Sequence, residues 1–207
     1  MTRMNIPDFF GSIQHDANEK GERVATGRQE VRRIALEKVR LELADLERAG
    51  VVVSGYAFSE VLLVKGEQGP AERAGEGLLR GADGRALKAA LLKLGYAPES
   101  WLALATWDAG GQTLDAALLR RAVLVLDPTC LIVLDEAAAN VVRLAYATEL
   151  AGLTRFEEAM LQAGSVAEVQ GMRVLNLGGF EAALASPHEK QVMWARLKRL
   201  PPEGSPY

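Results

Sequence analysis

The sequence predicts an α/β protein with three layers, α/β/α, around a central and mostly parallel sheet of about four strands. Short apolar runs of strand length alternate along the chain with longer segments of helical periodicity, which is typical of βαβ units. Some runs are apolar at every position, as strands buried on both faces are. With 207 residues, of which 49% are hydrophobic and 25% charged, the chain is long enough to form a packed domain of this kind.

The first 50 residues are predicted to form an N-terminal arm followed by an amphipathic helix. Residues 1–27 are mostly polar and have little periodicity. From Gln29 to Ala49 the pattern is helical, and Gly50 is its expected end. The apolar stripe of this helix consists of Leu36, Val39, Leu43 and Leu46. We expect the helix to pack on its own domain; a partner-binding or coiled-coil helix is the alternative, for which the stripe is short.

Residues 51–200 are predicted to form the α/β domain, and residues 201–207 a C-terminal tail. The runs predicted as strands are Val51–Gly55, Val61–Val64, Trp101–Ala105, Leu131–Leu134 and Arg173–Leu177. The segments predicted as helices are Arg85–Leu94, Leu114–Leu126, Glu136–Tyr146, Phe180–Ala185 and His188–Leu200. Gly152–Val169 is predicted to hold a helix or a lid-like segment. Ligands of parallel sheets bind at the carboxyl ends of the strands, so one cleft is expected there. Its expected segments are Gly66–Asp83, Thr106–Gln112, Asp135 and Gly178–Phe180.

Composition excludes several classes of protein. The net charge of −3 disfavours a protein that binds DNA tightly and nonspecifically by neutralising phosphates. The single cysteine, Cys130, excludes a disulfide framework, a cysteine-rich zinc site and a four-cysteine iron–sulfur cluster within this chain. No apolar run approaches the length of a membrane span, and the N-terminus lacks a signal-peptide pattern. We therefore expect a cytoplasmic protein without a metal or another cofactor.

Three segments of this chain occur in an order and at a spacing known from one family. The strand Val61–Val64 leads into Gly66-Glu67-Gln68-Gly69-Pro70, and a later loop, Leu78-Leu79-Arg80-Gly81-Ala82-Asp83-Gly84, leads into a helix. The closing segment carries Leu184, Pro187, Lys190 and Trp194. In these features the chain resembles the uracil-DNA glycosylase superfamily, especially its iron–sulfur-containing branch, over residues 51–200. The resemblance implies a three-layer fold and a base-binding cleft.

The chain departs from the family at the positions that recognise and release the base. Leu79 stands where the family has a stacking phenylalanine, and Ala105 or Thr106 where it has the asparagine that reads the base edge. Gly179 and Phe180 replace the family's His-Pro pair, and the cluster cysteines are absent. Base excision needs an aromatic platform, an edge reader and stabilisation of the departing base, so these changes predict lost glycosylase activity.

Glu67 is the one candidate catalytic residue, because a carboxylate at this position could orient or activate a water. The structural alternative is that it bonds to backbone amides of its own glycine-rich loop. The candidate ligand-binding positions are Gly66, Gln68, Leu79, Thr106, Asp108, Gly179 and Phe180. Asp108 is better explained as a solvated turn residue, and His188 as an exposed residue at the start of a helix.

Three functional hypotheses follow. The first is a divergent uracil-DNA glycosylase-like protein without glycosylase activity, with weak binding of DNA or a nucleobase, or a protein-interaction role. The second is an active glycosylase of altered base specificity that uses Glu67. The third is a purely structural or partner-binding domain, expected if Leu79 and Phe180 close the cleft with apolar packing.

Overall fold

The computed structural model describes residues 37–56, 59–97 and 101–202. The chain divides into two units, residues 1–42 and 43–207, and the fold described below is that of the second unit. The predicted arm, residues 1–27, and Leu36 of the predicted stripe lie outside the described residues. Residues 37–48 are helical, and Leu46 of this helix is buried in the core of the second unit.

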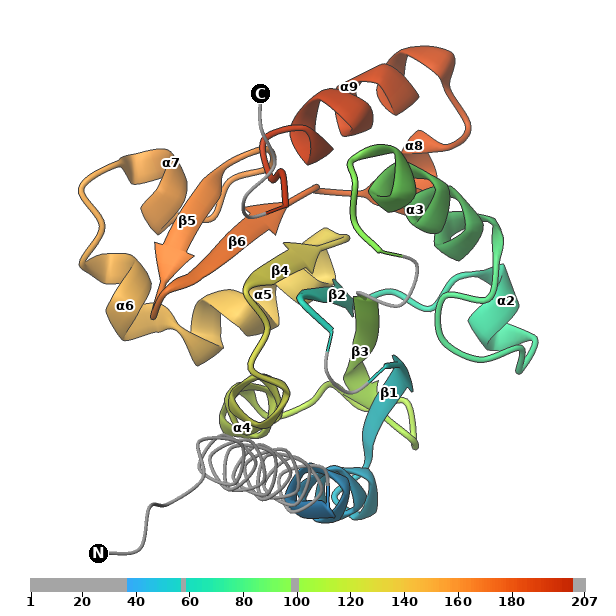
Figure 1. The fold of residues 1–207 in the computed structure, drawn as a ribbon, viewed down its shortest axis with the longest axis vertical. Coiled ribbons are helices and arrows are strands. Elements are labelled where there is room, and N and C mark those ends of the chain that lie inside the picture. The colour runs from blue at the N-terminus through green and yellow to red at the C-terminus, as the bar shows by residue number, and fades with distance from the viewer. Residues whose placement is uncertain (1–36, 57–58, 98–100, 203–207) are drawn as a thin grey trace, which may run out of the picture. The chain divides into compact units, whose positions relative to one another are not determined.

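The second unit is built around a six-stranded mixed sheet with the order β1-β3-β2-β4-β6-β5 (Figure 1). The strands are β1 (Val51–Gly55), β2 (Val61–Lys65), β3 (Trp101–Asp108), β4 (Cys130–Val133), β5 (Val166–Val169) and β6 (Met172–Asn176). The four central strands, β3, β2, β4 and β6, run parallel to one another. The two edge strands, β1 and β5, are antiparallel to theirs. The α/β class and the mostly parallel sheet are therefore confirmed.

The expected count of four strands is wrong, because the sheet continues beyond its parallel centre on both sides. At one edge, β5 lies in the segment for which we expected a helix or a lid. Its four residues, Val166–Val169, are too few to show a clear period. They pair with β6 through the tight turn Gln170-Gly171, where both residues have positive φ, 52° and 80°. This backbone conformation is the one that two-residue hairpin turns require.

Helices cover both faces of the sheet (Figure 1). The helices are α2 (Pro70–Arg73), α3 (Ala82–Lys93), α4 (Ala116–Leu126), α5 (Glu136–Ala145), α6 (Ala147–Ala151), α7 (Phe156–Ala159), α8 (Phe180–Ala183) and α9 (Pro187–Leu197). Side chains of α4, α5 and α6 pack in one hydrophobic cluster, and those of α3, α8 and α9 in another. In β2, Leu62 and Val64 belong to the first cluster, whereas Val61 and Leu63 belong to the second. Successive strand residues thus face opposite layers, as the pleat requires.

Register brings the carboxyl ends of the parallel strands to one edge of the sheet. Lys65 at the end of β2 is paired with Ala105 of β3, and Val133 at the end of β4 is paired with Val64 and Asn176. The loops that follow these strand ends therefore meet above the centre of the sheet. Among the described residues, no helix is both long and apolar enough to cross a membrane.

Candidate functional site

A pocket of about 250 Å³ lies at the carboxyl ends of β2, β4 and β6. The residues that line it are Lys65, Glu67, Asp83, Leu134, Asp135, Glu136, Gly178, Gly179, Phe180, Glu181 and Ala182. Five of these carry carboxylates, and Lys65 is the one cation among them. The site is thus a strongly acidic pocket at the place where parallel sheets bind ligands.

Lys65 lies at the centre of a buried ion cluster beside this pocket. Its ammonium donates hydrogen bonds of 3.0 Å to both carboxylate oxygens of Glu72 and of 2.5 Å to Asp83. A third acid, Glu181, lies 3.1 Å from the same nitrogen. The side chains of Lys65, Glu72 and Asp83 are no more than 6% exposed, whereas Glu181 is 39% exposed. We call these four residues the Lys65 cluster.

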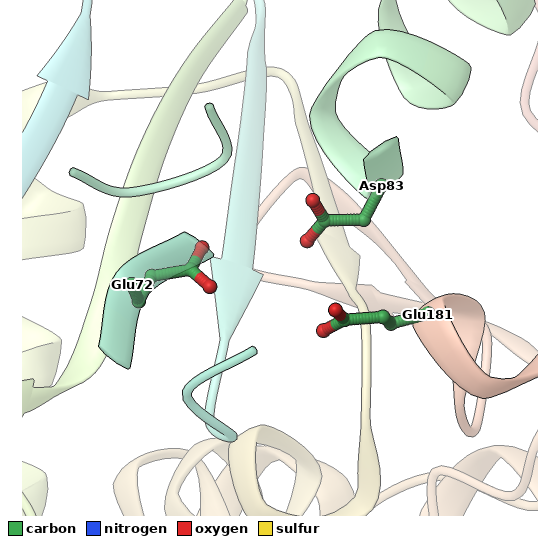
Figure 2. Close-up of side chains that lie close together, drawn as sticks. All are labelled: Glu72, Asp83 and Glu181. Carbon is green, nitrogen blue, oxygen red and sulfur yellow. The ribbon is translucent and has the colours of Figure 1, made fainter. Parts of the chain in front are cut away.

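Three different helices bring the carboxylates together. Figure 2 shows Glu72 on α2, Asp83 at the start of α3 and Glu181 on α8, with their carboxylates pointing toward a common centre. Glu72 is held in addition by backbone N–H groups, because its oxygens accept from Gly69 and Leu79, each at 2.9 Å. Each acid lies in the first turn of its helix, where negative charge is favoured by the helix dipole.

Opposing effects set the protonation states within the Lys65 cluster. Burial alone would lower the pKa of Lys65, but the bonds to Asp83, Glu72 and Glu181 outweigh burial and raise the pKa above its ordinary value. Burial alone would raise the pKa of Glu72, but the bonds from Leu79 N–H and from Lys65 outweigh it and lower the pKa. Lys65 is therefore a protonated ammonium at neutral pH, which makes it unsuited to act as a nucleophile or to form an imine.

Carboxylate oxygens of Glu72, Asp83 and Glu181 lie within 4.8 Å of one another, a separation that suits a metal ion. The Lys65 ammonium bonds to all three, so it already fills the position that a cation would take. A divalent ion would have to displace this ammonium. The cluster thus has the composition of a cation site in which the chain itself supplies the cation.

Asp135 ties the loop after β2 to the start of α5. Its carboxylate accepts from Gly66 N–H at 2.9 and 3.1 Å, from Glu67 N–H at 3.1 Å and from Ala138 N–H at 2.8 Å. The approach is so close that a Cβ on Gly66 would lie 2.1 Å from the backbone nitrogen of Ala138. A residue without a side chain is therefore required at position 66, which gives a structural reason for this glycine.

Glu67, Gly179 and Phe180 are the predicted site residues that line the pocket. Glu67 is exposed, and its carboxylate makes no hydrogen bond or ion pair within the described part of the chain. Its backbone N–H, in contrast, is bonded to Asp135. Gly179 has φ +132° and begins α8, and Phe180 is 4% exposed. Gly66 lies next to these residues, bound to Asp135.

The other predicted site residues do not line the pocket. Leu79 is 2% exposed and packs in the hydrophobic cluster of α3, α8 and α9, with φ +54°. Thr106 is buried in β3, and Gln68 is half-buried in the loop after β2. The carboxylate of Asp108 accepts from Gly110 N–H and Gln112 N–H at 2.9 and 2.8 Å, which is the bonding of a turn residue.

Sequence reasoning missed Lys65, Glu72 and Glu181 as site residues. A signal for Lys65 exists, because it directly follows four apolar residues of a strand that is buried throughout. A buried lysine requires carboxylate partners, since an unpaired charge in the interior is very costly. Glu72 and Glu181 carry no such signal, because acids in the first turn of a helix are common.

We expect the protein to lose stability at acidic pH, because the Glu72 carboxylate then becomes protonated. Its pKa is lowered in the folded state, so its contribution to stability is present above its ordinary pKa of 4.5 and is lost as the pH falls through its folded pKa. We expect the free energy of unfolding, measured with urea, to fall below about pH 4.5. Glu72→Gln should reduce the slope of the unfolding free energy against pH. Glu76→Gln, at an exposed position just after α2, should keep the wild-type slope. Equal slopes in the two variants would contradict the prediction.

No family model matches this chain, and no curated protein matches it at a significant level. The fold and the site together define a class, namely a three-layer α/β protein with an acidic pocket at the carboxyl edge of its parallel strands.

Proposed function

We propose that this protein is a divergent member of the uracil-DNA glycosylase superfamily that lacks glycosylase activity. The family part of the proposal rests on the sequence resemblance, and the observation that carries the loss of activity is the charge of the pocket at the strand ends. The resemblance puts the bound base and its sugar there, next to the phosphates of the DNA backbone. Phosphates are anionic, and DNA-binding sites neutralise them with lysine and arginine. This pocket has five carboxylates, and its one ammonium is already bonded to three acids.

Support also comes from the positions where the chain departs from the family. Leu79 packs in the core instead of forming a face for a base, and Thr106 is buried in β3. Gly179 offers no side chain to stabilise a departing base. Excision depends on contacts that favour the transition state over the ground state, and these positions supply none.

A second candidate function is that of a partner-binding domain without any role in DNA chemistry. Leu79 and Phe180 favour it, because both are buried in the same hydrophobic cluster and Phe180 forms part of the pocket wall. The buried Phe180 thus bounds the space in which a flipped base would lie. The remaining volume of about 250 Å³ is lined by charged groups rather than by apolar ones alone.

The proposal is tested by a single-turnover assay with protein in excess over labelled oligonucleotides that contain uracil or hypoxanthine. Single- and double-stranded forms are both used, with an active uracil-DNA glycosylase as positive control. We expect no abasic sites above the rate without protein. Cleavage that is lost in Glu67→Gln and retained in Glu76→Gln would overturn the proposal and would identify Glu67 as the catalytic carboxylate of an active enzyme.

A further inference from the structure

An apolar groove of about 480 Å³ lies between α3 and α9, and Phe180 of α8 lines both this groove and the acidic pocket. Figure 1 shows these two helices on the same side of the sheet, with α8 beside them. Small residues of α3, Ala86, Ala89 and Ala90, form one wall, and larger residues of α9, Met193 and Trp194, form the other. The alanine wall is shallow and the wall of Met193 and Trp194 is bulky, so the groove has room for side chains of another molecule.

The lining residues follow helical spacing on both walls. On α3 the groove residues are 86, 89, 90 and 93, and on α9 they are 190, 193, 194 and 197. Each set has the spacing i, i+3, i+4 and i+7, so each helix presents one continuous face over two turns. Two turns correspond to about 10 Å of helix, which matches the length of an apolar stripe on a short amphipathic helix.

The charges of the groove are all of one sign. Its charged lining residues are Lys93 and Lys190, and no carboxylate lines it, although the whole chain has a net charge of −3. Both lysines are exposed, and neither makes an ion pair with another described residue. This charge pattern is the opposite of that of the acidic pocket.

The two lysines lie at opposite ends of the groove. The hydroxyl of Tyr96, just after α3, donates to the backbone oxygen of Leu200, just after α9, at 3.0 Å. The C-terminal ends of the two helices are therefore adjacent. Lys93 lies in the last turn of α3, close to that end, whereas Lys190 lies near the start of α9.

We propose that this groove binds an amphipathic helix of a protein partner, with an apolar stripe along the groove and acidic residues at both ends of the stripe. The apolar walls accept the stripe, and Lys93 and Lys190 pair with the terminal acids. The inference does not depend on the family proposal, because it rests on the lining of a separate groove and concerns a different ligand.

The test uses a 15-residue helical peptide with leucine at positions i, i+3, i+4 and i+7 and glutamate on both sides of this stripe. A second peptide has lysine in place of each glutamate. Binding is measured by fluorescence anisotropy of a label on the peptide. We expect the acidic peptide to bind with a Kd on the order of tens of micromolar and the basic peptide at least ten times more weakly.

Variants of the protein then locate the site. Lys93→Glu combined with Lys190→Glu should reverse the preference between the two peptides. Lys198→Glu, an exposed position outside the groove, should leave the preference unchanged. Ala89→Arg should abolish binding by filling the groove. In the ¹H–¹⁵N spectrum the acidic peptide should shift the indole signal of Trp194 and leave Trp101 and Trp107 in place.

Several results would overturn the proposal. One is the absence of saturable binding by the acidic peptide, and another is equal affinity for both peptides in the wild-type protein. Peptide binding that shifts signals away from Trp194 would place the site elsewhere. Self-association that is abolished by Ala89→Arg, without peptide binding, would identify the occupant as a second copy of the chain.

Discussion

Replacing Lys65 with methionine should lower the free energy of unfolding at pH 7 by about 3–5 kcal/mol, the usual cost of removing one partner from a buried ion pair. The variant keeps most of the side-chain volume but leaves Glu72, Asp83 and Glu181 without their shared cation. Urea unfolding followed by circular dichroism measures the effect. Lys198→Met removes an exposed lysine and should change stability by less than about 0.5 kcal/mol.

The pH dependence of the Lys65→Met variant separates loss of charge from loss of packing. Buried carboxylates without a cation bind protons more readily in the folded state than in the unfolded state, so stability should rise as the pH falls from 7 to 5. Combining Lys65→Met with Asp83→Asn should recover part of the lost stability, since one of the repelling charges is gone. A Lys65→Met variant that is as stable as wild type would show that the cluster contributes nothing to the fold.

Replacing Asp135 with alanine should cost about 3–7 kcal/mol of stability. The loss of the helix cap of α5 contributes about 1 kcal/mol. The N–H groups of Gly66 and Glu67 also lose their acceptor, and each orphaned donor costs about 1–3 kcal/mol. Thermal unfolding and urea unfolding both measure the change.

Asp115 provides a matched control for Asp135. It caps α4 in the same way, by accepting from Ala117 N–H, but it is exposed and bonds to no second segment in the part of the chain that the structure describes. Asp115→Ala should therefore cost only about 1 kcal/mol. Equal losses in the two variants would mean that the bonds from Asp135 to the loop after β2 add no stability.

The parallel centre of the sheet could be predicted because its strands carry their own signal. Runs such as Val61–Val64 and Leu131–Leu134 are apolar at every position. This pattern is typical of strands that are buried on both faces of a sheet. The edge strand β5 has no such signal, because Val166–Val169 has one buried face and only four residues. Its pairing depends on the positive φ of Gln170 and on contact with β6, which a local pattern does not contain.

The site was less predictable than the fold, because its residues come from segments that lie far apart in the sequence. Glu67, Gly179 and Phe180 were found because they follow strands that end at the same edge. Glu72 and Glu181 were missed, because an acid in the first turn of a helix has the same appearance whether water or a buried ammonium is its partner.

The sequence separations within the Lys65 cluster determine the order in which its contacts can form while the chain is being synthesised. Two of the acids, Glu72 and Asp83, follow Lys65 after only seven and eighteen residues, whereas Glu181 comes from the C-terminal part of the chain. A growing chain therefore contains enough negative charge to neutralise the ammonium before α8 has been made. Contacts between near neighbours in sequence lose little loop entropy on closing. Strand β2 can thus become buried early without trapping an unpaired ammonium, and Glu181 joins last, at the exposed side of the cluster.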